Sequence, residues 1–106
     1  GGIDIYAPIG TPIYAPADGT VITIQKPSQS NGGGKYTIVD HGSGVWTEYM
    51  HQSKFAPGLK VGKRVNKGEI IGYVGKTGNV TGPHLHFGVM VDGVRRDPLK
   101  YVERPD

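Results

Sequence analysis

His84 and His86, two histidines separated by one residue, are the clearest candidates for chemistry in this sequence. They begin a segment whose β-branched and aromatic residues predict a strand, in which side chains two positions apart share a face. The apolar residues of this alternation are expected to face a core: Leu85, Phe87, Val89 and Val91. The two imidazoles then lie on the open face, and an exposed His-x-His pair favours a metal-binding or catalytic site.

His51 and Asp4 are the other two candidates. Strand alternation predicts that His51 shares a face with Thr47 and Tyr49, and Asp4 lies between two isoleucines that are expected to be buried. Imidazoles and a carboxylate suit a catalytic zinc, which takes three such protein ligands and keeps a position for water. Histidines that do not bind the metal would transfer protons. Residue types alone predict a metal site formed by histidine and aspartate, and they leave its substrate unknown. The fourth histidine, His41, lies in an Asp-His-Gly turn and is assigned a structural role.

Length and composition limit the class of protein. The chain has 106 residues, which is one domain, and its 18 glycines and 8 prolines separate short apolar runs as turns do. A net charge of +3 without basic runs argues against nucleic-acid binding. The absence of cysteine excludes a thiolate metal site. No segment approaches the ~20 apolar residues of a membrane-spanning helix.

The elements that must position these residues are short strands. The pattern predicts strands at 3–6, 10–16, 20–25, 35–40, 45–52, 69–74 and 84–91. Two tight turns at 61–68 should surround two buried valines, Val61 and Val65, and Asp92-Gly93 should form a hairpin turn. A single helical turn is expected over 99–102. The predicted class is therefore all-β, a barrel or a sandwich.

Several short motifs that follow one another in a fixed order resemble those of a known family. These motifs lie at residues 2–5, 7–13, 15–21, 49–51, 61–72, 75–78 and 81–87. With these motifs the chain resembles the M23 (lysostaphin-type) zinc metallopeptidases, which cleave peptide bonds in bacterial peptidoglycan. The resemblance covers nearly the whole chain. The portion at 61–72 is the least specific, because lipoyl-type domains use the same turn pattern.

The resemblance implies a role for each candidate. Asp4 and His86 would bind Zn²⁺, and His51 and His84 would be the unligated catalytic histidines. The implied fold is a small antiparallel sheet of the barrel-sandwich hybrid type. It would form the floor of a groove lined by the glycine-rich loops 26–34, 53–60 and 76–83. The implied protein acts on peptidoglycan peptides outside the cell, in the wall or the periplasm, as a monomer or as part of a multidomain chain.

One position departs from the family pattern. The family's first zinc ligand is a histidine four residues before the aspartate, and here that position falls immediately before Gly1. We therefore expect residues 1–106 to be a single peptidase domain that lacks its N-terminal segment, with the third ligand supplied from upstream.

Alternatives to this enzyme remain open from the sequence. The bond that is cut could belong to a glycine cross-bridge, which the glycines at 32–34 suggest, or to another cross-bridge or stem peptide. A non-catalytic module that binds the wall or activates another hydrolase is a competing class, although such modules tend to lose the site histidines. A lipoyl-like carrier is weaker, because no lysine lies at the tip of a matching hairpin.

Overall fold

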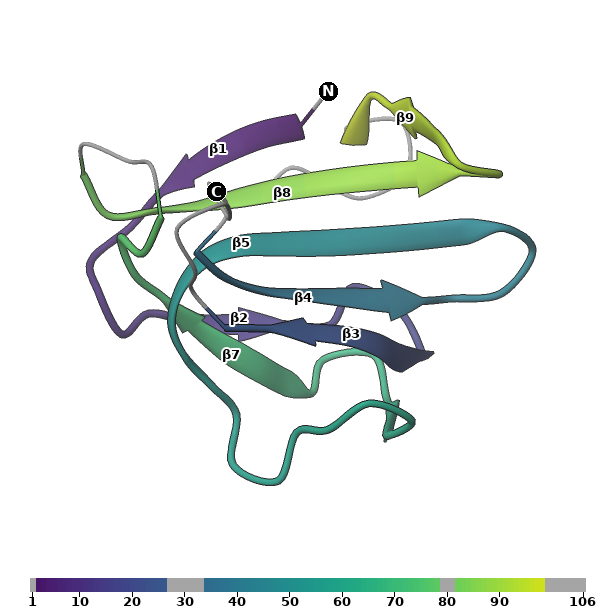
Figure 1. Cartoon of the computed structure of the whole chain (residues 1–106), viewed down its shortest axis with the longest axis horizontal. Helices are drawn as coiled ribbons and strands as arrows, with labels where there is room; N and C mark the ends of the chain where they lie inside the picture. Colours follow the sequence, from purple (N-terminus) through teal and green to yellow (C-terminus); the bar gives the residue numbers. More distant parts are fainter. Residues whose placement is uncertain (1, 27–33, 79–81, 99–106) are drawn as a thin grey trace.

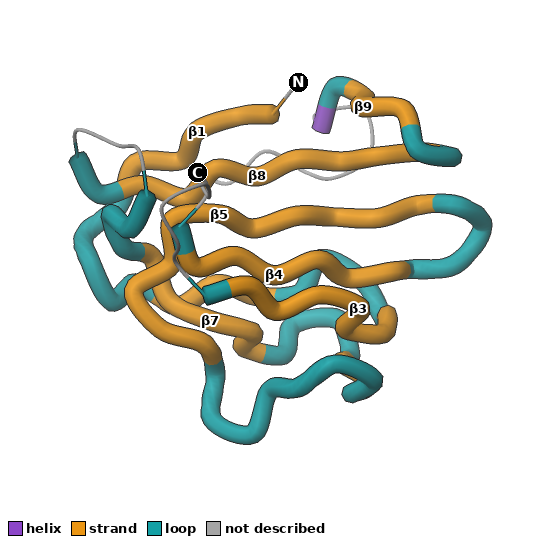
Figure 2. Tube along the Cα trace, in the orientation of Figure 1, coloured by secondary structure: helices purple, strands orange, loops and turns teal. Residues whose placement is uncertain are grey.

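The computed structural model describes residues 2–26, 34–78 and 82–98 of the chain. These residues form nine β-strands and no α-helix. Figures 1 and 2 show how the strands are arranged. The strands are β1 (Gly2–Tyr6), β2 (Pro12–Tyr14), β3 (Gly19–Gln25), β4 (Lys35–Asp40), β5 (Val45–Phe55), β6 (Arg64–Val65), β7 (Ile70–Val74), β8 (His84–Val91) and β9 (Val94–Arg96). The all-β prediction is confirmed. Within the described residues no helix is long and apolar enough to cross a membrane.

The strands are paired antiparallel throughout. The main path runs β1-β8-β5-β4-β3-β6, and Figure 1 shows its first four strands side by side. β5 is the longest strand: its first half lies between β4 and β8, and its last residues pair with β7. β7 in turn pairs with β2. Because one strand joins both groups, the sheet folds back over a single core.

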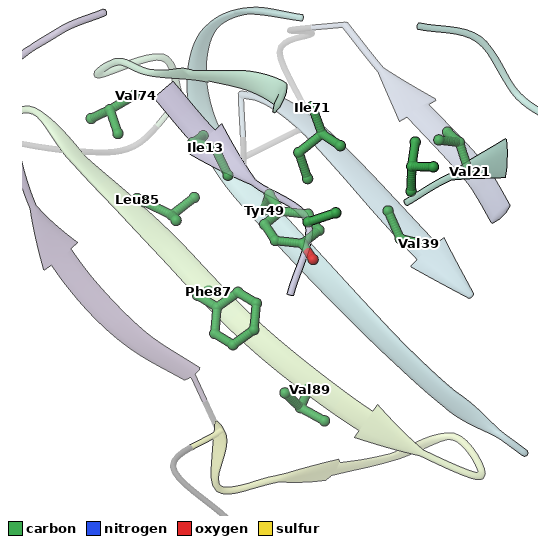
Figure 3. Packing of buried hydrophobic residues seen from close by; sticks show 11 residues of the cluster. Ile13, Val21, Val39, Tyr49, Ile71, Val74, Leu85, Phe87 and Val89 are labelled. Carbon is green, nitrogen blue, oxygen red and sulfur yellow. The ribbon is translucent and has the colours of Figure 1, made fainter. Parts of the chain in front are cut away.

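The core lies on one face of β8. Leu85, Phe87 and Val89 are buried, as alternation predicted, and Val91 packs against them at the edge of the cluster. The Phe87 ring lies 5.4 Å from the ring of Tyr49 on β5. Valines and isoleucines of the other strands complete the cluster in Figure 3. This apolar layer holds β8 in place, so the side chains of His84 and His86 lie on its opposite face.

Truncation of Phe87 tests the importance of this layer. Phe87→Ala is expected to lower the free energy of unfolding by about 3–5 kcal/mol, since it removes a buried aromatic ring and leaves a cavity. Urea unfolding followed by circular dichroism measures this change. Val94→Ala is the control, because Val94 is 53% exposed and its truncation should change stability by less than about 0.5 kcal/mol. Equal effects of the two substitutions would contradict the packing described here.

Some details of the strand predictions are corrected by the structure. Val65 is fully buried in β6, but Val61 is 61% exposed, so the prediction of two buried valines is wrong for Val61. The reason is that only Val65 pairs with β3, opposite Gly19, whereas Val61 lies in a turn. β2 is shorter than the predicted strand at 10–16, and β5 continues beyond residue 52.

Turn chemistry explains the hairpin between β8 and β9. Asp92 and Gly93 have φ angles of 52° and 80°, the left-handed conformation that a tight two-residue hairpin turn requires, so this prediction is confirmed. The expected helical turn at 99–102 lies outside the described residues. So do the glycines at 32 and 33 and parts of the loops 26–34 and 76–83 that were expected to line a groove.

Candidate metal and catalytic centre

The register of β1 against β8 builds the centre of the site. Asp4 lies directly opposite His86, on the face of β8 away from the core. Oδ1 of Asp4 is 2.8 Å from Nδ1 of His86 and 3.6 Å from Nε2 of His84. A single carboxylate therefore contacts both imidazoles of the His-x-His pair.

His51 reaches the same face through an irregularity in β5. Its neighbour Tyr49 faces the core, so strict alternation would send the His51 side chain into the core as well. Instead His51 has a φ of 65°, and the pairing of β5 with β4 and with β7 shifts register beside it. Its ring lies 4.8 Å from the ring of His84 and 6.3 Å from that of His86.

The structure thus brings all four candidates together, from strands β1, β5 and β8. The prediction that His51 shares a face with Thr47 and Tyr49 is wrong, since those two side chains are buried on the core side. The left-handed backbone at His51 is the physical reason, because it interrupts the two-residue alternation of the strand.

Backbone carbonyls orient the two histidines that do not hydrogen-bond to Asp4. Nδ1 of His51 is 2.7 Å from the carbonyl oxygen of Thr77, and Nδ1 of His84 is 3.0 Å from that of Gly82. A carbonyl only accepts hydrogen bonds, so in each neutral ring Nδ1 carries the hydrogen and Nε2 has a free lone pair. In His84 the Nε2 atom lies 3.6 Å from Oδ1 of Asp4.

The pKa of His51 is lowered from its usual value. Burial is the largest cause, and the neighbouring His84 and His86 lower the pKa further, while the hydrogen bond to Thr77 and the carboxylate of Asp4 act in the opposite direction. A lowered pKa favours the neutral form of His51, which is the form able to accept a proton.

Two glycines make room for neighbouring side chains on the face that carries His86. Gly2 and Gly88 are paired across β1 and β8. A Cβ atom on Gly2 would lie 2.5 Å from Nε2 of His86, and one on Gly88 would lie 2.6 Å from Oε1 of Glu48. Sequence reasoning missed this role of the glycines. The alternation of the two strands places Gly2 on the face of Asp4 and Gly88 on the face of His86, and this much the sequence could have indicated.

Glu48 is a further feature that the sequence did not reveal. Its side chain is only 4% exposed, although it lies on the same face as His86, and it pairs with Arg95 of β9. A buried carboxylate is stable only with such a partner. The pair therefore closes the open face on the side of β9.

The donor set was tested for its fit to a zinc ion. Asp4 and His86 present ligand atoms 2.8 Å apart, and a tetrahedral zinc with bonds of about 2.0–2.1 Å separates its ligand atoms by roughly 3.3 Å. A small outward movement of either side chain reaches that separation. Among the described residues no three His, Cys, Asp or Glu side chains form a metal-binding group. Asp4 and His86 thus fit two positions of a zinc site that needs a further ligand.

His41 has the structural role expected of it. Nδ1 of His41 is 2.8 Å from the carbonyl oxygen of Asp18, and Nε2 is 2.7 Å from Oγ1 of Thr47. Thr47 is in turn hydrogen-bonded to the buried hydroxyl of Tyr49. These bonds fix the β4–β5 turn against the core, and they leave both ring nitrogens of His41 occupied.

A separate apolar cavity of about 600 Å³ lies on the other face of β1 and β8. Its lining includes Ile3, Ile5, Leu85 and Phe87, which alternate with the site residues along these strands. The cavity therefore belongs to the core side and contains none of the four candidates.

Comparison with known proteins identifies close relatives. Residues 1–98 match the sequence model of Peptidase family M23. The chain is 41% identical over 104 residues to the peptidoglycan DD-endopeptidase ShyC of Vibrio cholerae, covering 98% of this chain and 23% of the relative. The chain thus spans about a quarter of the length of this curated relative.

Two solved structures share the fold. A zinc-containing peptidase from Vibrio cholerae superposes with a TM-score of 0.85 at 37% identity, covering 99% of this chain and 30% of the other. The catalytic domain of lysostaphin from Staphylococcus simulans superposes with a TM-score of 0.86 at 35% identity, covering 97% and 78%. The predicted small antiparallel β fold of the lysostaphin type is confirmed by these matches.

Proposed function

Because the chain belongs to peptidase family M23, we propose that it is a zinc-dependent endopeptidase that hydrolyses peptide bonds in bacterial peptidoglycan. The observation that carries the proposal is the convergence of Asp4, His51, His84 and His86 on one open face. A non-catalytic wall-binding or activating module has no need of this arrangement. The names of the relatives, a DD-endopeptidase and a zinc-containing peptidase, support the catalytic proposal.

Asp4 and His86 are the proposed zinc ligands. Their side chains already lie in contact, and the third ligand is proposed to be a histidine at the position of the family pattern four residues before Asp4. When bound, the zinc supplies a Lewis acid that polarises the scissile carbonyl and makes its bound water acidic. Gly2 leaves the room in which the His86 ring lies.

His51 and His84 are the proposed proton carriers. Each has Nδ1 hydrogen-bonded to a backbone carbonyl, so Nε2 is the atom that accepts the proton of the attacking water. The protonated ring then donates that proton to the leaving amine or to the developing charge on the carbonyl oxygen. His84 is the nearer of the two to the proposed zinc ligands, because its Nε2 lies 3.6 Å from Oδ1 of Asp4.

The proposed substrate is an extended peptide of the peptidoglycan. The paired glycines Gly2 and Gly88 leave room for the His86 ring and the Glu48 side chain, so these two side chains lie close against the sheet under the proposed substrate. The DD bond named for ShyC and a glycine cross-bridge are both compatible with this surface. The site of action is the wall, the periplasm or the extracellular space, and the protein works as a monomer or within a multidomain chain.

Digestion of purified peptidoglycans tests the proposal. We expect the parent protein, upstream segment included, to release muropeptides whose masses identify one cleaved bond among substrates with different cross-bridges. A chelator should stop the release, and added zinc should restore it. Binding to the wall without any cleavage, in the presence of zinc, would establish the non-catalytic alternative instead.

A further inference from the structure

We propose that Thr77 is a positioning residue that holds His51 in the orientation and tautomer needed for proton transfer. This inference rests on the proposed function, in which Nε2 of His51 accepts a proton. Thr77 lies in the loop between β7 and β8, and its hydrogen bonds to described residues go to His51, Gln52 and Lys35. It would act through His51 alone.

Three hydrogen bonds connect Thr77 to its surroundings. Its carbonyl oxygen accepts from Nδ1 of His51 at 2.7 Å. Its hydroxyl donates to the carbonyl oxygen of Gln52 at 2.7 Å and accepts from the backbone N–H of Lys35 at 3.0 Å. The residue thus joins β4, β5 and the loop that leads to β8, and it contacts both the ring of His51 and the carbonyl of the next residue, Gln52.

The conformation of His51 explains why such contacts are needed. A φ of 65° is rare for a residue with a side chain, so the backbone does not adopt it without support from its neighbours. Gln52 provides part of that support, since its side-chain amide donates to Thr37 and to the carbonyl of Tyr49. The carbonyl of Gln52 is held by the Thr77 hydroxyl. The irregular turn of β5 is therefore fixed on both sides of His51.

Close packing against Gly34 restricts the position of Thr77. A Cβ atom on Gly34 would lie 2.4 Å from the carbonyl carbon of Thr77, so the approach of the two backbones depends on that glycine. The hydroxyl hydrogen bonds then set the direction of the Thr77 carbonyl. That direction determines which nitrogen of His51 carries the hydrogen, because the carbonyl accepts only from Nδ1–H.

Two complementary substitutions separate the hydroxyl from the rest of the side chain. Thr77→Val keeps the shape and removes both hydroxyl hydrogen bonds, whereas Thr77→Ser keeps the bonds and removes the methyl group. We expect kcat on peptidoglycan to fall about 10- to 100-fold in Thr77→Val, with KM changed less than about threefold, because a misplaced group mainly affects the chemical step. Thr77→Ser should retain kcat within about threefold, and zinc content should be unchanged in both.

The tautomer of His51 gives a readout that does not depend on activity. Nitrogen NMR of the imidazole rings should show the Nδ1–H tautomer for His51 in the unsubstituted protein. A substantial Nε2–H population is expected in Thr77→Val, since a histidine without such an acceptor favours that form. This measurement remains valid even if the protein proves not to cleave peptidoglycan, so failure of the proposed function is distinguishable from failure of this inference.

Three results would overturn the role of Thr77. They are an Nε2–H tautomer for His51 in the unsubstituted protein, unchanged kcat and tautomer in Thr77→Val, and equal losses of kcat in Thr77→Val and Thr77→Ser. The first of these needs no variant, so the inference is tested even if Thr77→Val fails to fold.

Discussion

Replacing His86 by alanine is expected to remove bound zinc and peptidase activity together. His86 presents Nδ1 to Asp4 at 2.8 Å, and this pair supplies the two zinc ligands proposed within the chain. Without His86 the site keeps too few ligands for a catalytic zinc. Activity should fall by about 10³-fold or more, since the metal supplies several kcal/mol of stabilisation to the transition state. Metal analysis and peptidoglycan digestion of the same preparation give both quantities.

His41→Ala is the matched control for this substitution. It removes another imidazole from the chain, but His41 hydrogen-bonds to Asp18 and Thr47 in the β4–β5 region and is not part of the centre. A folded His41→Ala protein should keep its zinc and its activity. Full zinc content in His86→Ala would show that His86 is not a ligand.

Replacing His84 by alanine is expected to remove activity while zinc remains. The Nε2 atom of His84 lies 3.6 Å from the Asp4 carboxylate, next to the proposed metal but outside its proposed ligand set. Loss of a general acid–base group lowers the rate about 10²- to 10⁴-fold. The same pair of measurements, zinc content and digestion rate, separates this outcome from that of His86→Ala.

The comparison between the two variants is more informative than either alone. If His84→Ala lost zinc and His86→Ala retained it, the roles of the two histidines would be reversed. If both variants kept full activity, the His-x-His pair would have no part in the reaction. Thermal unfolding of each variant checks that a loss does not come from unfolding, since His84 is largely buried.

Much of the fold follows from local patterns in the sequence. The alternation of apolar residues in 84–91 identified β8 and both of its faces, because a strand packed on one side leaves the other side free. Asp92-Gly93 identified the hairpin that follows, since both residues tolerate a left-handed backbone. The pairing of Asp4 with His86 was not readable in this way. It depends on the register between strands more than 80 residues apart.

The irregular features of the site could not be predicted from the sequence, and the reason is physical. His51 lies on the open face because its backbone is left-handed, and the strand alternation used to predict its side-chain direction does not indicate where such a backbone occurs. Thr77 and Gly34 meet through long-range packing, and Glu48 is buried only because Arg95 reaches it from β9. Each of these features depends on tertiary contacts, and residue propensity and hydrophobic periodicity carry no information about such contacts.

The central claim is that Asp4 and His86 hold a zinc ion beside His51 and His84. A crystal structure of the zinc-loaded parent protein, with anomalous data collected on both sides of the zinc absorption edge, tests it most directly. The account predicts one strong zinc peak about 2.0–2.2 Å from Oδ1 of Asp4 and from Nδ1 of His86. A zinc peak elsewhere in the protein, with Asp4 and His86 still hydrogen-bonded to each other, would contradict it.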